Sequence, residues 1–305
     1  LKTEFNLPDG IADTGKTKIK VRTQTKDKRS ASGFKEVEQE VHKVQILDPA
    51  TGTGTFLAEV VQHIYNSRFK QMQGIWSSYV ENDLIPRLNG FELLMASYSM
   101  AHLKLDMLLR ETGFKATKNQ RFNIYLTNSL EEHHPDTGTL FANWLSSEAN
   151  EANHIKRDTP VMVVMGNPPY SVSSTNKGEW IQNLIKDYKK DLNERKINLD
   201  DDYIKFIRYG QHFIDKNGEG ILAYISNNSF LNGITHRRMR KNLIECFDKI
   251  YILDLHGNSN IKEKKPDGKP DKNVFDIKQG VSINIFIKTG KKINNGQILH
   301  KNLFG

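Results

Sequence analysis

The stretch Asn167-Pro168-Pro169-Tyr170 constrains this chain most, because a stiff turn directly follows an apolar run. The run covers residues 161–166, and its unbroken apolar character is typical of a parallel strand that is buried on both faces. Two consecutive prolines fix φ twice and remove two backbone donors. The sequence therefore predicts a rigid turn at the carboxyl end of a buried strand, where open α/β sheets bind their ligands.

The residue types in this turn suit one kind of ligand. The side-chain oxygen of Asn167 and the carbonyl oxygen of Pro168 are two neighbouring acceptors, which match the two hydrogens of a planar NH2 group. Tyr170 adds a flat face on which an aromatic ring can stack. The turn thus predicts a clamp for an amine attached to an aromatic ring, and the alternative is a proline-rich turn without a ligand.

A second motif lies upstream, in the run ILDPATGTGTFL over residues 46–57. An apolar strand from about residue 44 enters a turn with Gly52 and Gly54, and a helical pattern follows from Thr55. The two glycines permit a tight turn and a close approach to a ligand. Leu57 stands where the dinucleotide-binding pattern G-x-G-x-x-G needs its third glycine, so that fingerprint is absent. Asp48 at the strand end is placed to meet an amino-acid ammonium or an ordered water.

Together the two motifs resemble motifs I and IV of the S-adenosylmethionine-dependent amino-methyltransferases. Their order is that of the gamma-type adenine-specific DNA methyltransferases. More closely, the chain resembles the methyltransferase part of the single-polypeptide Type I (Type ISP) restriction-modification enzymes, from about residue 44 to about residue 290. The further stretches that carry this resemblance are residues 90–94, 98–105, 201–206, 253–257, 273–277 and 280–283.

The order of strand and helix patterns predicts an α/β fold. Helical patterns at 55–69, 93–110, 202–214 and 233–246 separate most of the strand-like runs, which implies a parallel sheet. Only a loop over residues 258–272 joins the last two runs, so these can pair antiparallel. The resemblance likewise implies a Rossmann-like methyltransferase fold, with a seven-stranded, mostly parallel sheet and a reversed last strand at its edge. The seven runs are residues 44–48, 88–92, 122–128, 161–167, 220–226, 250–256 and 281–288.

The resemblance implies S-adenosylmethionine as the cofactor, no metal, and a role for several residues. The alternatives are a helix-starting glutamate for Glu92, a strand-end turn for Asn128 and ordinary core packing for Phe275. The expected catalytic residues are Asn167, Pro168 and Tyr170, and the expected base-stacking pair is Tyr170 and Phe275. The expected cofactor-binding residues are Asp48, Ala50, Thr51, Gly52, Gly54, Phe56, Glu92 and Asn128.

The implied reaction is methyl transfer to the exocyclic N6 amine of adenine in double-stranded DNA, with the adenine flipped out of the duplex. The implied companions are covalently linked motor, nuclease and target-recognition domains. One alternative is a methyltransferase for another planar amine, in protein glutamine, RNA guanine or cytosine. Another is a binding module that has lost catalysis.

The expected organisation is an N-terminal extension over residues 1–43, a methyltransferase domain over 44–290 and a linker over 291–305. Because the chain opens with Leu1 and lacks a recognisable motif X, we expect a fragment of a longer protein. The formal net charge of +8 and a pI near 9.3 suit a polyanionic partner. Cys246 is the only cysteine, and no signal peptide or membrane-length apolar stretch occurs, so we expect a cytoplasmic protein without disulfides.

A competing motif occurs in the first 43 residues. The run GIADTGKT over residues 10–17 matches the P-loop pattern, which would make Lys16 part of a nucleotide-hydrolysing module. A P-loop needs a buried strand before it and a helix after it, whereas residues 18–25 alternate like an exposed strand. We also expect a solvated loop rather than a metal site at His133 and His134, and a mobile loop over residues 171–200.

Overall fold

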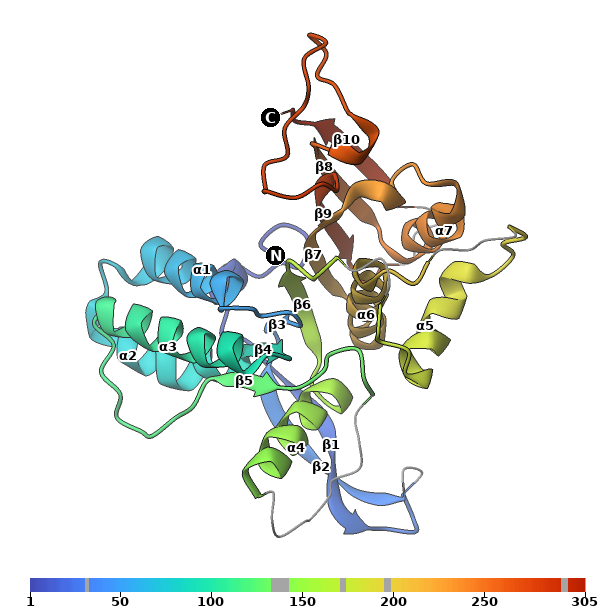
Figure 1. Cartoon of the computed structure of the whole chain (residues 1–305). Coiled ribbons are helices and arrows are strands. Elements are labelled where there is room, and N and C mark those ends of the chain that lie inside the picture. Colours follow the sequence, from blue (N-terminus) through green and yellow to red (C-terminus); the bar gives the residue numbers. More distant parts are fainter. Residues whose placement is uncertain (31–32, 133–142, 171–173, 195–198, 292–295, 305) are drawn as a thin grey trace. The chain divides into compact units, whose positions relative to one another are not determined.

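The computed structural model describes residues 1–30, 33–132, 143–170, 174–194, 199–291 and 296–304 (Figure 1). These residues form two compact units, Leu1–Met162 and Val163–Gly305. Each unit contributes strands flanked by helices, as the alternating sequence pattern predicts. The single methyltransferase domain over residues 44–290 stays a prediction.

The first unit is built on three parallel strands. Strand β3 (Gln45–Asp48) pairs with β4 (Leu88–Glu92), which pairs in turn with β5 (Asn123–Leu126). All four β3 residues are buried, as the apolar run predicts. The carboxyl ends of β3 and β4 therefore lie at one edge, where Asp48 is opposite Gly90.

Four helices accompany these strands. Figure 1 shows the first three of them together beside the strands of this unit. They are α1 (Thr55–Ile64), α2 (Gln73–Tyr79), α3 (Met95–Glu111) and α4 (Asn143–Arg157).

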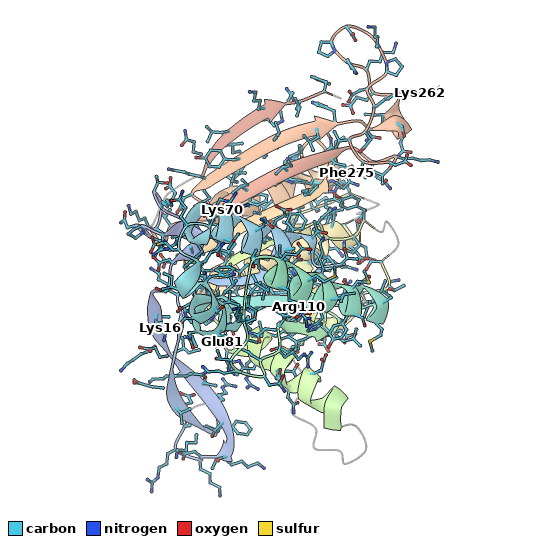
Figure 2. All side chains as sticks on the ribbon, turned by 90° about the vertical axis from the view of Figure 1, so that its left-hand side faces the viewer. Lys16, Lys70, Glu81, Arg110, Lys262 and Phe275 are labelled. Atoms are coloured by element: carbon cyan, nitrogen blue, oxygen red, sulfur yellow. The ribbon has the colours of Figure 1, made fainter. Side chains whose placement is uncertain are left out.

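An antiparallel hairpin precedes β3, and its position shows that residues 10–17 do not form a P-loop. It consists of β1 (Lys16–Lys26) and β2 (Phe34–His42), with Lys16 opposite His42 (Figure 2). A short 3-10 turn (Gly10–Ala12) lies before it, and a strand rather than a helix begins at Lys16. The backbone around Lys16 thus has neither the strand nor the helix that a phosphate-binding loop requires.

Replacing Lys16 by alanine is expected to leave nucleotide binding, methyl transfer and stability nearly unchanged. The Lys16 ammonium is exposed and lies 3.7 Å from the Glu40 carboxylate, an ion pair worth about 0–1 kcal/mol at a surface. Thermal unfolding and ATP hydrolysis of the full-length Lys16→Ala protein would check this. Loss of ATP hydrolysis at unchanged stability would show that a nucleotide site had been overlooked.

The second unit contains five strands in the order β10-β8-β9-β7-β6. Strand β6 (Val161–Gly166), which begins two residues before the unit boundary, is parallel to β7 (Gly220–Asn227). Strand β9 (Val281–Lys288) lies between β7 and β8 (Lys249–His256) and runs antiparallel to both. Strand β10 (Gln297–Asn302) is parallel to β8.

Three helices belong to this unit: α5 (Glu179–Lys189), α6 (Asp202–Asn217) and α7 (Arg237–Cys246). Helix α6 begins where the Asp201 side chain accepts the Tyr203 backbone N–H. It ends at Gly218, whose φ of 84° lets the chain leave the helix in the left-handed conformation.

The mainly parallel α/β fold is confirmed, and each of the seven predicted strand ranges overlaps a strand. Two details differ. The reversed strand β9 is internal rather than at the edge, because β8 and β7 flank it. Strand β10 was not predicted, and it lies within the stretch 291–305 that was expected to be a linker.

Two helices were not predicted. Helix α5 lies within residues 171–200, where a mobile loop was expected, and α4 lies in a polar stretch for which no secondary structure was predicted. His133 and His134 lie outside the described residues. No helix in the described part of the chain is both long and apolar enough to cross a membrane.

Candidate active site

The turn between β3 and α1 is held by the first residues that leave the strand. One oxygen of the Asp48 carboxyl group, Oδ1, accepts the Ala50 N–H at 3.1 Å. The Thr51 hydroxyl donates to the Asp48 carbonyl oxygen at 2.9 Å. The backbone then passes through Gly52 at φ 55° and Gly54 at φ 80°, a conformation that glycine adopts without strain.

The glycines around this turn have different surroundings. A Cβ on Gly54 would lie 3.1 Å from the Ala101 Cβ of α3, and one on Gly90 would lie 2.5 Å from the Thr51 hydroxyl. A Cβ on Gly52 would meet nothing within 4 Å. Gly54 and Gly90 therefore permit close packing, whereas Gly52 leaves space beside the backbone that a ligand can enter. Phe56, in the first turn of α1, is half-buried.

Glu92 ties the β3–α1 turn to the start of α3. Its Oε2 accepts the Gly52 N–H at 2.7 Å, and its Oε1 accepts the N–H groups of Leu93 and Leu94 at 2.9 and 2.8 Å. Glu92 thus has the helix-start role that the sequence analysis gave as its alternative. A carboxylate has about four acceptor positions, so one on Oε2 is left for a ligand hydroxyl.

Asp48 is an unusual carboxyl group in this turn. It is fully buried, and its second oxygen, Oδ2, has no hydrogen-bond partner among the described residues. Burial raises the pKa of Asp48 to about 7; the Ala50 N–H opposes this rise, and the charge of Glu92 adds to it. Asp48 therefore carries a proton over much of the neutral and acidic range.

Asp48→Asn is expected to flatten the dependence of stability on pH. Between about pH 4 and pH 7 the folded chain holds a proton that the unfolded chain has lost, so the free energy of unfolding falls as pH rises. Asparagine stays neutral and still accepts from Ala50, so the variant should be the more stable protein at pH 8, by about 2–4 kcal/mol. Urea unfolding at pH 4.5 and pH 8 without cofactor measures this. Equal pH slopes in both proteins would contradict it.

The end of β5 is organised by Asn128 together with Ser129 and Lys156, two residues that the sequence did not single out. Asn128 accepts the Leu130 N–H through Oδ1 at 3.0 Å, which is the turn role given above as its alternative. The Lys156 ammonium donates to the Asn128 carbonyl at 2.7 Å, and burial lowers the pKa of Lys156 to about 8. The Ser129 hydroxyl donates to the Pro49 carbonyl at 2.5 Å and so joins this turn to the one after β3. Lys156 comes from α4 within a polar stretch, so no periodicity or motif marked it.

In the second unit, the Asn167-Pro168-Pro169-Tyr170 turn follows β6 directly. Asn167 and Pro169 are exposed, Pro168 is buried and Tyr170 is half-buried. The Tyr170 hydroxyl donates to the Asn167 Oδ1 at 2.8 Å. Burial raises the pKa of Tyr170 to about 12, so the phenol remains a donor at neutral pH. The predicted acceptor therefore has a local partner in the ligand-free chain, while the amide oxygen keeps a second lone pair.

A buried lysine anchors residues 174–176, which follow shortly after this turn. The Lys205 ammonium of α6 is fully buried and donates to the Ser174 hydroxyl and the Asn176 carbonyl, both at 2.7 Å. It also pairs with the Asp200 carboxylate at 2.7 Å. The loop expected to be mobile is thus fixed here, since a buried ammonium requires its partners.

Phe275 lies between β8 and β9 and is 38% exposed, so ordinary core packing does not describe it (Figure 2). Its backbone N–H donates to the Asn273 Oδ1 at 2.8 Å. An exposed aromatic side chain on an ordered backbone can offer its face to a flat ligand.

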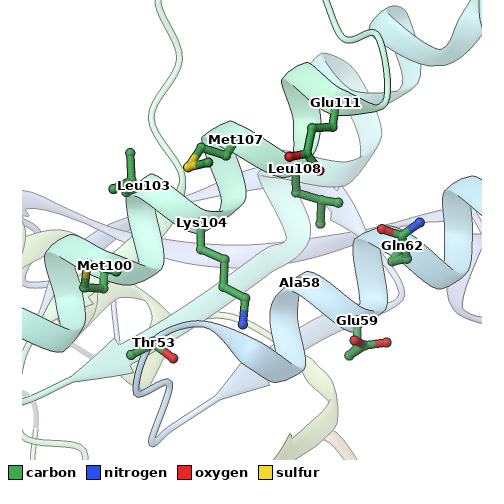
Figure 3. Close-up of a pocket in the computed structure, with 10 residues that line it drawn as sticks. All are labelled: Thr53, Ala58, Glu59, Gln62, Met100, Leu103, Lys104, Met107, Leu108 and Glu111. Carbon is green, nitrogen blue, oxygen red and sulfur yellow. The ribbon is translucent and has the colours of Figure 1, made fainter.

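A cavity of about 520 Å³ lies between α1 and α3 (Figure 3). Met100, Leu103 and Met107 supply its apolar wall, and the Lys104 ammonium donates to the Thr55 hydroxyl at 3.0 Å. None of the residues predicted to bind the cofactor lines it, but the cavity adjoins their turn, because Thr53 of the lining stands between Gly52 and Gly54. In the described ranges, no three His, Cys, Asp or Glu side chains are grouped so that they could hold a metal ion.

Comparison with known proteins places the chain in a family of methylases. Residues 88–261, more than half of the chain, match the family described as Eco57I restriction-modification methylase. The Type II methyltransferase M.BstVI of Geobacillus stearothermophilus is 26% identical over 228 residues, which are 73% of this chain and 35% of that protein.

Two solved structures are similar over 86% of the chain. The ATP-dependent Type ISP restriction-modification enzyme LlaBIII bound to DNA is 27% identical with a TM-score of 0.73, and the DrdV–DNA complex is 28% identical with a TM-score of 0.67. The chain spans 18% and 25% of these two proteins and about a third of M.BstVI.

Proposed function

Because the chain belongs to the Eco57I restriction-modification methylase family, we propose that it transfers a methyl group from S-adenosylmethionine to the N6 amine of adenine in DNA. The observation that carries the choice of substrate is the turn after β6. There an amide oxygen, a proline carbonyl and an aromatic ring follow one another within four residues. The full-length protein would act as part of a restriction-modification enzyme, in the cytoplasm.

The turn suits a planar amine because such an amine is a poor nucleophile. Its lone pair is delocalised into the ring, and it becomes available when the nitrogen turns pyramidal. Asn167 and the Pro168 carbonyl accept the two N–H hydrogens and favour that shape. The Tyr170 hydroxyl, which holds Asn167 Oδ1 in place at 2.8 Å, orients the acceptor before the base arrives. Catalysis by these residues is positioning and electrostatic stabilisation.

The turn after β3 and the end of β4 are the proposed cofactor site. When bound, S-adenosylmethionine would supply an electrophilic methyl group on a sulfonium, whose sulfur would leave as a neutral thioether while the methylated amine gives its proton to water. Gly52 leaves space for the cofactor, and the remaining acceptor position of Glu92 suits a ribose hydroxyl. Asp48 holds the turn through Ala50, and Asn128 is the proposed neighbour of the cofactor's adenine.

The target base must leave the duplex before it can reach the clamp, at a cost of a few kcal/mol. Stacking on an aromatic side chain stabilises the bound base by about 1–3 kcal/mol, which offsets part of this cost. We therefore assign Tyr170 and Phe275 as the two stacking faces, which the exposure of Phe275 supports. Double-stranded DNA is the proposed partner, and motor, nuclease and target-recognition domains are proposed to be linked to this chain.

The experiment that tests the substrate class offers DNA, RNA and protein to the full-length enzyme together with S-adenosylmethionine labelled in its methyl group. Label in DNA alone is the expected result. Label in RNA or protein would favour another planar amine, such as that of guanine or glutamine. Cofactor binding without transfer to any of the three would indicate a binding module.

A further inference from the structure

The segment between β8 and Phe275 forms a lobe over residues 257–272, and its two ends meet at one tight contact. The Gly257 N–H donates to the Asp271 Oδ2 at 2.7 Å, and Asn273 Nδ2 donates to the Gly257 carbonyl at 3.2 Å. A Cβ on Gly257 would lie 2.4 Å from the Asn273 Cα and 2.8 Å from its backbone nitrogen. We call Gly257, Asp271 and Asn273 the neck of the lobe.

One side chain connects the neck to Phe275. Asn273 uses its Nδ2 for the Gly257 carbonyl and, at 2.6 Å, for the Gln279 carbonyl. Its Oδ1 accepts the Phe275 N–H at 2.8 Å. The backbone on both sides of Phe275 is therefore fixed by a residue whose own position depends on the absence of a side chain at Gly257.

His256 braces the neck from the preceding position. Its ring nitrogens face two acceptors: Nδ1 lies 2.8 Å from the Glu263 Oε1, and Nε2 lies 2.9 Å from the Asn302 Oδ1. The other Glu263 oxygen accepts the Asn258 N–H at 2.9 Å, so Glu263 also holds the first residues of the lobe. The ring is stacked on Phe304, with centroids 4.2 Å apart. His256 thereby connects the lobe to the segment after β10.

We propose that the neck is a positioning element for Phe275, which sets the direction in which the aromatic ring is offered to the flipped base. This rests on the proposed function, in which Phe275 stacks on that base. Gly257 and Asn273 then act on DNA methylation through Phe275 alone. They touch neither the base nor the cofactor.

Gly257→Ala tests the proposal, with Gly268→Ala as the matched control. Both glycines belong to the lobe and have left-handed φ values, 74° and 84°, so both substitutions strain the backbone. A Cβ on Gly268 meets nothing within 4 Å, whereas one on Gly257 strikes Asn273. We expect Gly257→Ala to lower kcat/KM for DNA about 5- to 100-fold, with cofactor affinity unchanged, and Gly268→Ala to have little effect.

The Phe275→Ala background separates positioning from general damage. There, Gly257→Ala should cause little further loss, because both changes remove the same stacked ring. Additive losses, or an equal loss from Gly268→Ala, would overturn the proposal. So would a Gly257→Ala protein that methylates DNA like wild type.

Amide hydrogen exchange of the cofactor-free protein tests the neck independently of catalysis. Gly257→Ala should accelerate exchange of the Phe275 N–H, and Gly268→Ala should not. If the Phe275 N–H exchanged at the wild-type rate in Gly257→Ala, the positioning role of the neck would be refuted, even if the wild-type enzyme methylates DNA. If the Phe275 N–H exchanged faster in Gly257→Ala but the wild-type enzyme did not methylate DNA, the structural role of the neck would stand and the proposed function would be refuted.

Discussion

Replacing Asn167 by alanine is expected to reduce methyl transfer by about 10²–10³-fold, the loss typical for one preorganised polar group at a reacting centre. The variant loses the side-chain acceptor of the clamp. The backbone should remain folded, because Asn167 is exposed and the two prolines still fix the turn. Single-turnover methylation of DNA by the full-length protein measures the loss.

Tyr170→Phe is the matched control for Asn167→Ala. It removes the hydroxyl that donates to Asn167 at 2.8 Å but keeps the aromatic face. We expect a loss of at most about 10-fold, as for one neutral hydrogen bond. A folded Asn167→Ala protein that turns over at the wild-type rate would remove Asn167 from the mechanism.

Glu92→Ala is expected to weaken cofactor binding by about 30- to 200-fold, which corresponds to about 2–3 kcal/mol, and to lower the melting temperature. The carboxylate accepts the N–H groups of Gly52, Leu93 and Leu94, so its removal frees the turn after β3 and the start of α3 together. Hydrogen bonds to a charged group contribute about 1.5–3 kcal/mol when buried. We use the value for about one such bond, because Leu93 and Leu94 are exposed and only the Gly52 N–H belongs to the turn that would hold the cofactor.

Calorimetric titration of S-adenosylmethionine into wild type, Glu92→Ala and Glu92→Gln tests this expectation. Glutamine keeps one acceptor oxygen and should give an intermediate affinity. It should also lower the pKa of Asp48, because the charge of Glu92 contributes to raising that pKa. Wild-type affinity in Glu92→Ala would show that the cofactor binds elsewhere.

The sheet was largely predictable because buried parallel strands are continuous apolar runs, as residues 161–166 illustrate. Strand β10 was not, since its six residues are exposed and only its pairing with β8 makes it a strand. The internal place of β9 likewise follows from long-range pairing, which chain order does not reveal. Helix α4 was missed because its stretch is predominantly polar. Helix α5 does have an apolar face at helical spacing, formed by Ile181, Ile185 and Tyr188, and the surrounding Ser, Asn and Lys residues obscured it.

The local backbone geometry of the candidate site was predictable, whereas the roles of its residues stay predictions. Glycines in the turn after β3 and prolines in the turn after β6 encode their own conformations. Hydrogen-bond partners from distant positions in the chain could not be predicted from a local sequence pattern. Lys156 and Lys205 hold backbone carbonyls, and only the fold brings them there. The match to the P-loop pattern at residues 10–17 is the opposite case. The local pattern is present, but a strand begins at Lys16 where a phosphate-binding loop needs a helix.

The N6 nitrogen of adenine is the proposed acceptor of the methyl group. The most direct test digests DNA to nucleosides after incubation with the full-length protein and S-adenosylmethionine labelled in its methyl group. We expect label in N6-methyladenine, and its loss when Asn167 is replaced by alanine. Label in N4-methylcytosine, or N6-methyladenine formed equally well by the Asn167→Ala protein, would contradict it.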